Sequence, residues 1–254
     1  FLTDTKDPPV MKLKSLLISL AAVSAFAAGA ANAAQVVVTT GAGYVKMVDA
    51  LASLYQKETG VAVEKSFGGN IGQMLAQVKH GNGVNVVISD EATLAKFNDD
   101  LAPAARRLGD TPLVLVWRKG LNLEKAEDIA LDAVKSVASP NPKAAIYGRS
   151  AAKWLQAAGL EAKVAPKLQV VGTVPQVYSY VTTGNMDAGF VNLAVLKSGT
   201  DKLGGHIAIH DESAVVHMTA RPVRGAEADA DVKAFMDFLA SDKARAVLKK
   251  FGIQ

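Results

Sequence analysis

The sequence predicts an α/β protein of two lobes, each with a mixed, mostly parallel sheet that carries helices on both faces. Short runs of β-branched and apolar residues alternate with amphipathic helical segments, which is typical of βαβ units. The chain of 254 residues has room for one or two domains. It contains no cysteine, so its stability has to come from hydrophobic cores and not from disulfides.

The beginning of the chain has the features of a secretory signal peptide. A basic stretch at Met11–Lys14 precedes an apolar run over residues 15–29, and Ala31-Asn32-Ala33 fits a small-residue cleavage site. A membrane anchor is the alternative, but the run is short and rich in Ala compared with the roughly 20 apolar residues of a span. We therefore expect residues 11–33 to be a cleaved signal peptide and residues 1–10 to lie upstream of the true start.

Charge and motif content exclude several classes of function. Residues 1–33 contain three Lys and two Asp, so the net charge falls from +4 for the whole chain to +3 for a mature chain that starts near Ala34. This mild balance fits an anionic ligand without indicating one, and no basic run interleaved with aromatic residues suggests nucleic acid. The sequence has no cysteine nucleophile, no G-x-S-x-G and no H-E-x-x-H. We therefore predict that the protein is not an enzyme and has no metal site.

The segment around which the rest is organised is a strand, turn and helix. Val36–Thr40 contains five β-branched residues and predicts a buried strand. The small turn Gly41-Ala42-Gly43 follows, and then an amphipathic helix from Val45 to about Lys57. N–H groups at a helix start have no partner inside the helix and lie at the positive end of its dipole. The turn therefore predicts an anion seat, although most Gly-rich turns serve only backbone geometry.

A second segment of this kind follows. The predicted strand Val61–Phe67 leads into the small polar turn Gly68-Gly69-Asn70, and a helix is predicted from about Gln73 to Lys79. The remaining predicted strands are 86–88, 113–117, 136–138, 168–171, 187–191, 207–209 and 214–219, and the remaining predicted helices are 91–97, 127–129, 146–158, 174–182, 230–240 and 243–251. We expect Leu113–Trp117 and Val215–Thr219 to cross between the lobes. This places residues 34–114 and 218–254 in lobe 1 and residues 115–217 in lobe 2.

Five motifs, taken in order, carry a family resemblance. They are the opening strand-turn-helix, Ser66–Asn70, Ser139-Pro140 with Ala144–Tyr147, Val174 with Gly189–Asn192, and Phe235 to Gly252 with its aromatic residues. Together they resemble the periplasmic molybdate-binding proteins of bacterial ABC importers, over nearly all of residues 34–254. The resemblance implies a type II periplasmic-binding-protein ("Venus flytrap") fold, a periplasmic monomer without a cofactor, and a permease in the inner membrane as partner. It implies molybdate or a related oxyanion as ligand.

Neutral hydrogen-bond donors hold the oxyanion in that family. By position, the resemblance places the ligand-binding residues at Ala42, Gly43, Gly69, Asn70, Lys143, Ala144, Val174 and Asn192. Gly43 and Asn70 stand where the family has serines, and Asn192 stands where it has a tyrosine. Because these changes remove hydroxyls and leave more room, the alternative is a receptor for another anion, such as sulfate, tungstate, a small carboxylate or a phosphorylated compound, in import, adhesion or sensing.

Several of these residues have alternative interpretations. Lys143 adds a positive charge to the site if it turns inward, or is a solvated loop lysine. Asn192 is a ligand contact or a capping residue, and Tyr147 is a core residue or a contact. His206 and His210 have the spacing of a helical zinc pair, but the alternation of His206–His210 indicates a strand, which separates the two rings.

Overall fold

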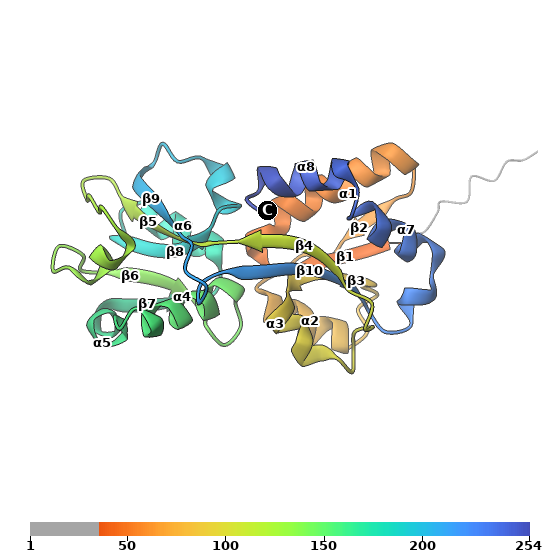
Figure 1. Cartoon of the computed structure of the whole chain (residues 1–254), viewed down its shortest axis with the longest axis horizontal. Coiled ribbons are helices and arrows are strands. Elements are labelled where there is room, and N and C mark those ends of the chain that lie inside the picture. Colours follow the sequence, from red (N-terminus) through yellow and green to blue (C-terminus); the bar gives the residue numbers. More distant parts are fainter. Residues whose placement is uncertain (1–35) are drawn as a thin grey trace, which may run out of the picture. The chain divides into compact units, whose positions relative to one another are not determined.

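The computed structural model describes residues 36–254 (Figure 1), so the predicted signal peptide and residues 1–10 lie outside the described residues. The strands are β1 (Val36–Thr40), β2 (Val63–Lys65), β3 (Val86–Asp90), β4 (Arg106–Thr111), β5 (Leu113–Arg118), β6 (Val137–Pro140), β7 (Leu168–Val171), β8 (Ala188–Asn192), β9 (Leu203–Ile209) and β10 (Val216–Pro222). The α-helices are α1 (Val45–Thr59), α2 (Ile71–Lys79), α3 (Glu91–Leu94), α4 (Ile146–Ala157), α5 (Glu161–Val164), α6 (Val174–Thr182), α7 (Ala230–Phe238) and α8 (Asp242–Lys250). Six short 3-10 turns, among them η1 (Ala42–Tyr44), η2 (Ala95–Phe97) and η5 (Val195–Ser198), lie between these elements in the described part.

The first sheet has the strand order β2-β1-β3-β10-β4. β1 pairs in parallel with β2 and β3, and β10 pairs antiparallel with β3 and β4. Parallel neighbours need a crossover, and crossovers are right-handed in nearly all proteins. The connections from β1 to β2 and from β2 to β3 run in opposite directions along the sheet. They therefore put α1 and α2 on opposite faces, as Figure 1 shows.

The second sheet repeats this plan with the order β7-β6-β8-β5-β9. β6 is parallel to β7 and β8, whereas β5 is antiparallel to β8 and β9. α4 and α6 connect these strands in opposite directions and cover opposite faces for the same reason. The predicted α/β fold with mixed sheets and helices on both faces is thus confirmed, with parallel and antiparallel pairings in each sheet.

The chain passes between the two sheets at two places in the described part. Pro112 alone separates β4 in the first sheet from β5 in the second, and residues 210–215 join β9 to β10. Beside the first passage, Asp110 exchanges two backbone hydrogen bonds with the last residue, Gln254 (2.7 and 2.9 Å). The lobe boundaries predicted from the sequence, after residues 114 and 217, fall inside β5 and β10 just beyond these passages and stay a prediction.

Buried strands and aromatic contacts form the core. All five residues of β3 are buried, as are four of the five in β1, which fits strands covered by helices on both faces. Tyr55 of α1 packs edge-on against Phe235 of α7, with ring centroids 5.1 Å apart. Trp154 of α4 packs in the same way against Phe190 of β8 at 5.9 Å. Each sheet therefore has its own aromatic anchor.

One strand was not predicted. β4 contains the charged pair Arg106 and Arg107, and it has no β-branched run. Its pairing with β10 and a bond from Arg106 Nε to the Met236 carbonyl (3.1 Å) stabilise it instead. A segment with this composition becomes a strand because tertiary contacts override its weak propensity.

Gly148 offers a test of how α4 is seated. A Cβ at this position would lie 2.3 Å from the Pro140 carbonyl oxygen and 2.6 Å from the Asn141 carbonyl carbon. Both are backbone atoms and cannot easily move. We expect Gly148→Ala to lower the free energy of unfolding by about 1–3 kcal/mol through overpacking, although Gly→Ala in an open helix adds about 1 kcal/mol. Chemical denaturation measures the change.

The matched control is Gly68→Ala, because its added Cβ would meet only Met74 Sδ, at 3.7 Å. We expect a change close to zero for this variant. A Gly148→Ala protein as stable as the wild type would contradict the seating of α4 on the end of β6.

Candidate functional site

A small cavity lies where four turns and helix starts meet. Two of these, η1 and the start of α2, follow strands of the first sheet, and the starts of α4 and α6 follow strands of the second. The cavity has a volume of about 20 Å³ and is lined by Gly41, Ala42, Gly43, Tyr44, Asn70, Ile71, Ala145, Ile146, Tyr147, Thr173 and Val174. None of these side chains is charged.

The first wall is made of two turns that hold each other. The Ala42 N–H donates to the Gly69 carbonyl at 2.8 Å, and the Tyr44 N–H donates to the Gly41 carbonyl at 2.9 Å. A larger residue at position 41 would crowd the start of α2, because its Cβ would lie 3.1 Å from the backbone nitrogen of Ile71. The two turns are therefore fixed in close contact at the edge of the cavity.

Side-chain caps begin two of the helices. The Asn70 side chain accepts from the Gln73 N–H and the Gln73 side chain accepts from the Asn70 N–H, both at 3.0 Å, which is a capping box. Thr173 and Gln176 form the same box at the start of α6. Because Asn70 is the cap, α2 begins at Ile71, before the start near Gln73 that the sequence predicted. Each box uses the N–H of the cap residue and the N–H of the third helical residue, and leaves the N–H of the first helical residue free.

The start of α4 is prepared by a turn. The N–H groups of Ala144 and Ala145 both donate to the Asn141 carbonyl, at 3.1 and 2.8 Å. The Ala144 carbonyl accepts from the N–H of Gly72 in α2 at 3.1 Å. The backbone N–H and the carbonyl of Ala144 therefore both make hydrogen bonds within the protein, and the carbonyl links the turn before α4 to α2.

Some backbone N–H groups around the cavity have no hydrogen-bond partner. Among the cavity-lining residues of η1 and of the first turns of α2, α4 and α6, five have a backbone N–H for which the described structure shows no hydrogen bond: Gly43, Ile71, Ile146, Tyr147 and Val174. Each belongs to η1 or to the first turn of a helix, where no intrahelical partner exists. A group of unpaired donors at helix starts has the chemistry of an anion site.

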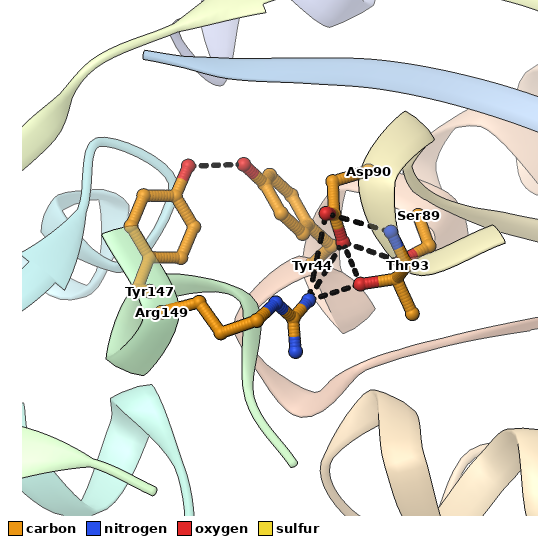
Figure 2. Close-up of polar contacts among 6 residues, drawn as sticks. All are labelled: Tyr44, Ser89, Asp90, Thr93, Tyr147 and Arg149. Carbon is orange, nitrogen blue, oxygen red and sulfur yellow. Dashed lines mark hydrogen bonds and ion pairs between the residues drawn. The ribbon is translucent and has the colours of Figure 1, made fainter. Parts of the chain in front are cut away.

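Two phenols add hydroxyl groups to this wall. Tyr44 and Tyr147 are each 1% exposed, their ring centroids are 6.1 Å apart, and their hydroxyls are hydrogen-bonded to each other (Figure 2). Burial raises the pKa of both phenols, well above the usual value for Tyr44, whose pKa the neighbouring Tyr147 raises further. Both tyrosines are therefore neutral hydroxyl donors at physiological pH.

Asn192 is fully buried beside the cavity but does not line it. Its Nδ2 donates to the Gly43 carbonyl at 3.0 Å, and its Oδ1 accepts from the Val195 N–H at 2.9 Å. The side chain thus bonds to the first residue of η5 and at the same time joins β8 of the second sheet to η1, which follows β1 of the first. Both interpretations of Asn192, ligand contact and capping residue, stay predictions; the structure shows its two hydrogen bonds, to Gly43 and Val195.

The structure brings together four of the eight predicted ligand-binding residues. Ala42, Gly43, Asn70 and Val174 line the cavity, whereas Gly69, Lys143, Ala144 and Asn192 do not. The Lys143 side chain is exposed. Sequence reasoning missed Tyr44, Ile71 and Ile146. The Asn70–Gln73 capping box was the signal that could have placed the helix start, and hence the free donor, at Ile71.

A second polar contact lies near the cavity and also joins elements of the two sheets. Arg149 of α4 forms an ion pair with Asp90 of β3 (3.1 Å), and the Thr93 hydroxyl is hydrogen-bonded to both side chains (Figure 2). Asp90 also caps α3 by accepting from the Thr93 N–H at 3.0 Å. This cluster holds α4, and with it the start that lines the cavity, against the first sheet.

Other chemistry is not indicated in the part of the chain that the structure describes. No group of three or more His, Cys, Asp or Glu residues is placed to hold a metal ion there. His206 lies in β9, as its alternating pattern predicted. Among the same residues, no helix is both long and apolar enough to cross a lipid bilayer.

Comparisons with known proteins place this cavity in context. The family model for bacterial extracellular solute-binding proteins matches residues 36–254. The chain is 28% identical to the molybdate-binding protein ModA of Azotobacter vinelandii, over 94% of this chain and 97% of that one. It is 26% identical to a putative ABC transporter substrate-binding lipoprotein of Bacillus subtilis, over 76% and 75% of the two chains. The solved A. vinelandii periplasmic molybdate-binding protein superposes with a TM-score of 0.77 at 26% identity, over 86% of this chain and 98% of that chain.

Because Tyr44 and Tyr147 are buried as neutral phenols, we expect the folded protein to lose stability at alkaline pH. Their pKa values are raised in the folded protein, whereas unfolded phenols ionise near pH ~10. The stabilisation is therefore complete below about pH 10 and is lost as pH rises above it. We expect the phenolate absorbance of the folded protein to stay below that of all five tyrosines until alkaline unfolding begins, and Tyr147→Phe to reduce the pH dependence of unfolding. Ionisation of all five before unfolding would contradict the burial of this pair.

Proposed function

The chain belongs to the family of bacterial extracellular solute-binding proteins, and from that premise we propose that its cavity binds molybdate or a related oxyanion for an ABC importer. The ligand contacts η1 and the starts of α2, α4 and α6. The resemblance to molybdate-binding proteins, seen in five sequence motifs, is supported by relatives of that name along nearly the whole chain. These relatives are binding proteins, which fits a protein without catalysis.

The observation that carries the proposal is the set of five unpaired N–H groups of η1 and the helix starts around one cavity. Hydrogen bonds to a charged group contribute about 1.5–3 kcal/mol each. A dianion that leaves water needs several of them to offset its desolvation. Five backbone donors, with roughly half a positive charge at each helix start, are of the right number and kind.

The donor set also indicates which anion is favoured. No lining side chain is charged, so a bound anion is released without separating a salt bridge. A fully deprotonated tetrahedral anion accepts hydrogen bonds at every oxygen, whereas hydrogen phosphate carries an O–H that itself needs an acceptor. An array of donors disfavours that O–H and discriminates against phosphate.

The size of the cavity favours a compact ligand. Its volume of about 20 Å³ is little more than the ~10–15 Å³ that a single water requires. A tetrahedral oxyanion is nearer to this size than citrate or a phosphorylated sugar acid. The alternative of a larger organic anion is the one that this volume favours less, and sulfate and tungstate remain candidates beside molybdate.

Delivery to a permease follows from where the donors lie. Gly43 and Ile71 lie in segments that follow strands of the first sheet. Ile146 and Val174 lie at helix starts that follow strands of the second sheet. An anion that contacts both sets stabilises the arrangement in which they meet and shifts the population toward it. A permease that recognises this arrangement distinguishes loaded from empty receptor. The periplasmic location, the cleaved signal peptide, the monomeric state and the two lobes (34–114 with 218–254, and 115–217) complete the proposal.

A thermal-shift panel tests the choice of ligand. The panel contains molybdate, tungstate, sulfate, phosphate, citrate and phosphoglycerate. We expect a fully deprotonated tetrahedral anion to stabilise the protein most, by roughly 2.7 kcal/mol at a concentration 100 times its Kd, and phosphate to stabilise it less. A shift only with citrate or phosphoglycerate would favour the alternative receptor, and no shift with any anion would overturn the proposal.

Val174→Pro tests a single backbone donor. Proline is accepted at the first helical position and has no N–H, so the variant deletes one donor and keeps α6. We expect the Kd for the best anion of the panel to rise roughly 10- to 150-fold, as for the loss of one hydrogen bond to a charged group, measured by titration calorimetry.

Two controls accompany this variant. Val174→Ala keeps the N–H and should bind as the wild type does. Lys143→Ala removes an exposed charge outside the cavity and should leave Kd nearly unchanged. Equal affinity of Val174→Pro and Val174→Ala would remove the Val174 N–H from the site.

A further inference from the structure

We propose that the Thr173 hydroxyl is a ligand contact, a side-chain donor that acts together with the backbone donors around the cavity. The inference rests on the proposed binding of an oxyanion there, and it assigns a contact that neither the sequence patterns nor the family resemblance indicated. Thr173 directly precedes α6 and lines the cavity. Its position at the helix start determines what each of its polar groups does.

Three polar groups of Thr173 are used within the start of α6. Residues 173–176 have the T-x-x-Q pattern of a capping box. The Thr173 N–H donates to Gln176 Oε1 at 3.0 Å, and the Gln176 N–H donates to Thr173 Oγ1 at 3.4 Å. A backbone N–H can only donate, so Oγ1 is the acceptor in the second bond. The Thr173 carbonyl accepts from the Val177 N–H at 3.3 Å.

The proton of the Thr173 hydroxyl is the group that remains. Within residues 36–254, the structure gives Oγ1 no hydrogen bond other than the one that it accepts from Gln176. A hydroxyl carries one proton, which rotates to suit its partners, so this proton is available to an acceptor that enters the cavity. An oxygen of an anion is such an acceptor, and hydrogen bonds to charged groups are the strong ones.

The same turn also holds a backbone donor. Val174 follows Thr173, lines the cavity and has an N–H without a partner in the described structure. Pro175 has no N–H, and the N–H of the next residue is used by the cap. A Cβ at Gly43 would lie 3.4 Å from the Val174 Cβ, so this turn lies against η1. The start of α6 therefore offers two donors on consecutive residues, one from a side chain and one from the backbone.

The cap of α2 has the same arrangement. Asn70 Oδ1 accepts from the Gln73 N–H, and the Asn70 N–H donates to Gln73 Oε1, both at 3.0 Å. Because the facing N–H has to be a donor, the amide oxygen is fixed on the helix and Nδ2 is the free end. In the described structure Nδ2 has no acceptor, and Asn70 lines the cavity. One cap after a strand of each sheet thus keeps a side-chain donor at the cavity.

Three substitutions at position 173 separate a donor from a cap. Gly is about as good a cap as Thr, Ser is better and Val is poor, but only Ser keeps the hydroxyl. The backbone of Thr173 is extended (φ −144°, ψ 158°), which all three residues adopt. The probes are molybdate and sulfate, titrated by calorimetry into variants that are folded by circular dichroism. We expect Thr173→Gly and Thr173→Val to raise Kd roughly 10- to 150-fold, as for the loss of one hydrogen bond to a charged group, and Thr173→Ser to leave Kd nearly unchanged.

A role in capping alone predicts a different order, because Thr173→Gly would then bind as the wild type does. That result would overturn the inference, and so would wild-type affinity in Thr173→Val. Ser241→Gly is the matched control, since Ser241 Oγ accepts from the Ala244 N–H (3.1 Å) at the start of α8, outside the cavity, and we expect it to leave Kd unchanged. A wild type that binds neither probe would overturn the proposed function and this inference with it, whereas a wild type that binds, with Thr173→Gly unchanged, removes only the inference.

Discussion

The site depends on a constraint that every helix carries: its first N–H groups have no partner within the helix. Most buried backbone groups find a partner, because an unpaired one costs as much as a lost hydrogen bond. Here η1 and the helices α2, α4 and α6 start at one place, and five N–H groups of these starts remain unpaired around a common cavity. Strands of both sheets lead into these starts, so both sheets are needed to bring the starts together at the cavity.

The caps decide which donors remain. Asn70 and Thr173 satisfy the N–H groups at the third helical position, and the glutamines of the two boxes satisfy the caps themselves. Neither box uses the N–H of the first helical residue, so Ile71 and Val174 keep theirs. A capping box is usually discussed as a stabilising feature of a helix. In this protein it also restricts the unpaired donors to the residues that line the cavity.

The sequence predicted the alternating elements and two of the four starts well, because hydrophobic periodicity and small turns are local signals. The small turn predicted a seat at Gly43, whereas Val174 was assigned to the site by the family resemblance. Prediction from the sequence failed where a long-range contact decides the outcome. β4 is a strand only through its pairing with β10, and the pairing of Tyr44 with Tyr147 joins residues far apart in the chain. No pattern within one segment contains that information.

The departures from the family pattern at Gly43 and Asn192 are linked by geometry. A Cβ at position 43 would lie 3.0 Å from Asn192 Nδ2 and 3.4 Å from the Val174 Cβ, so a serine there would crowd the amide that bonds to the Gly43 carbonyl. The resemblance implies a serine at the first position and a tyrosine at the second, which are two hydroxyl donors. In this chain Tyr44 and Tyr147 lie at the same cavity and bring two hydroxyls from other positions. Loss of the first pair therefore does not remove hydroxyls from the site, and the buried amide of Asn192 occupies the space that Gly43 leaves open.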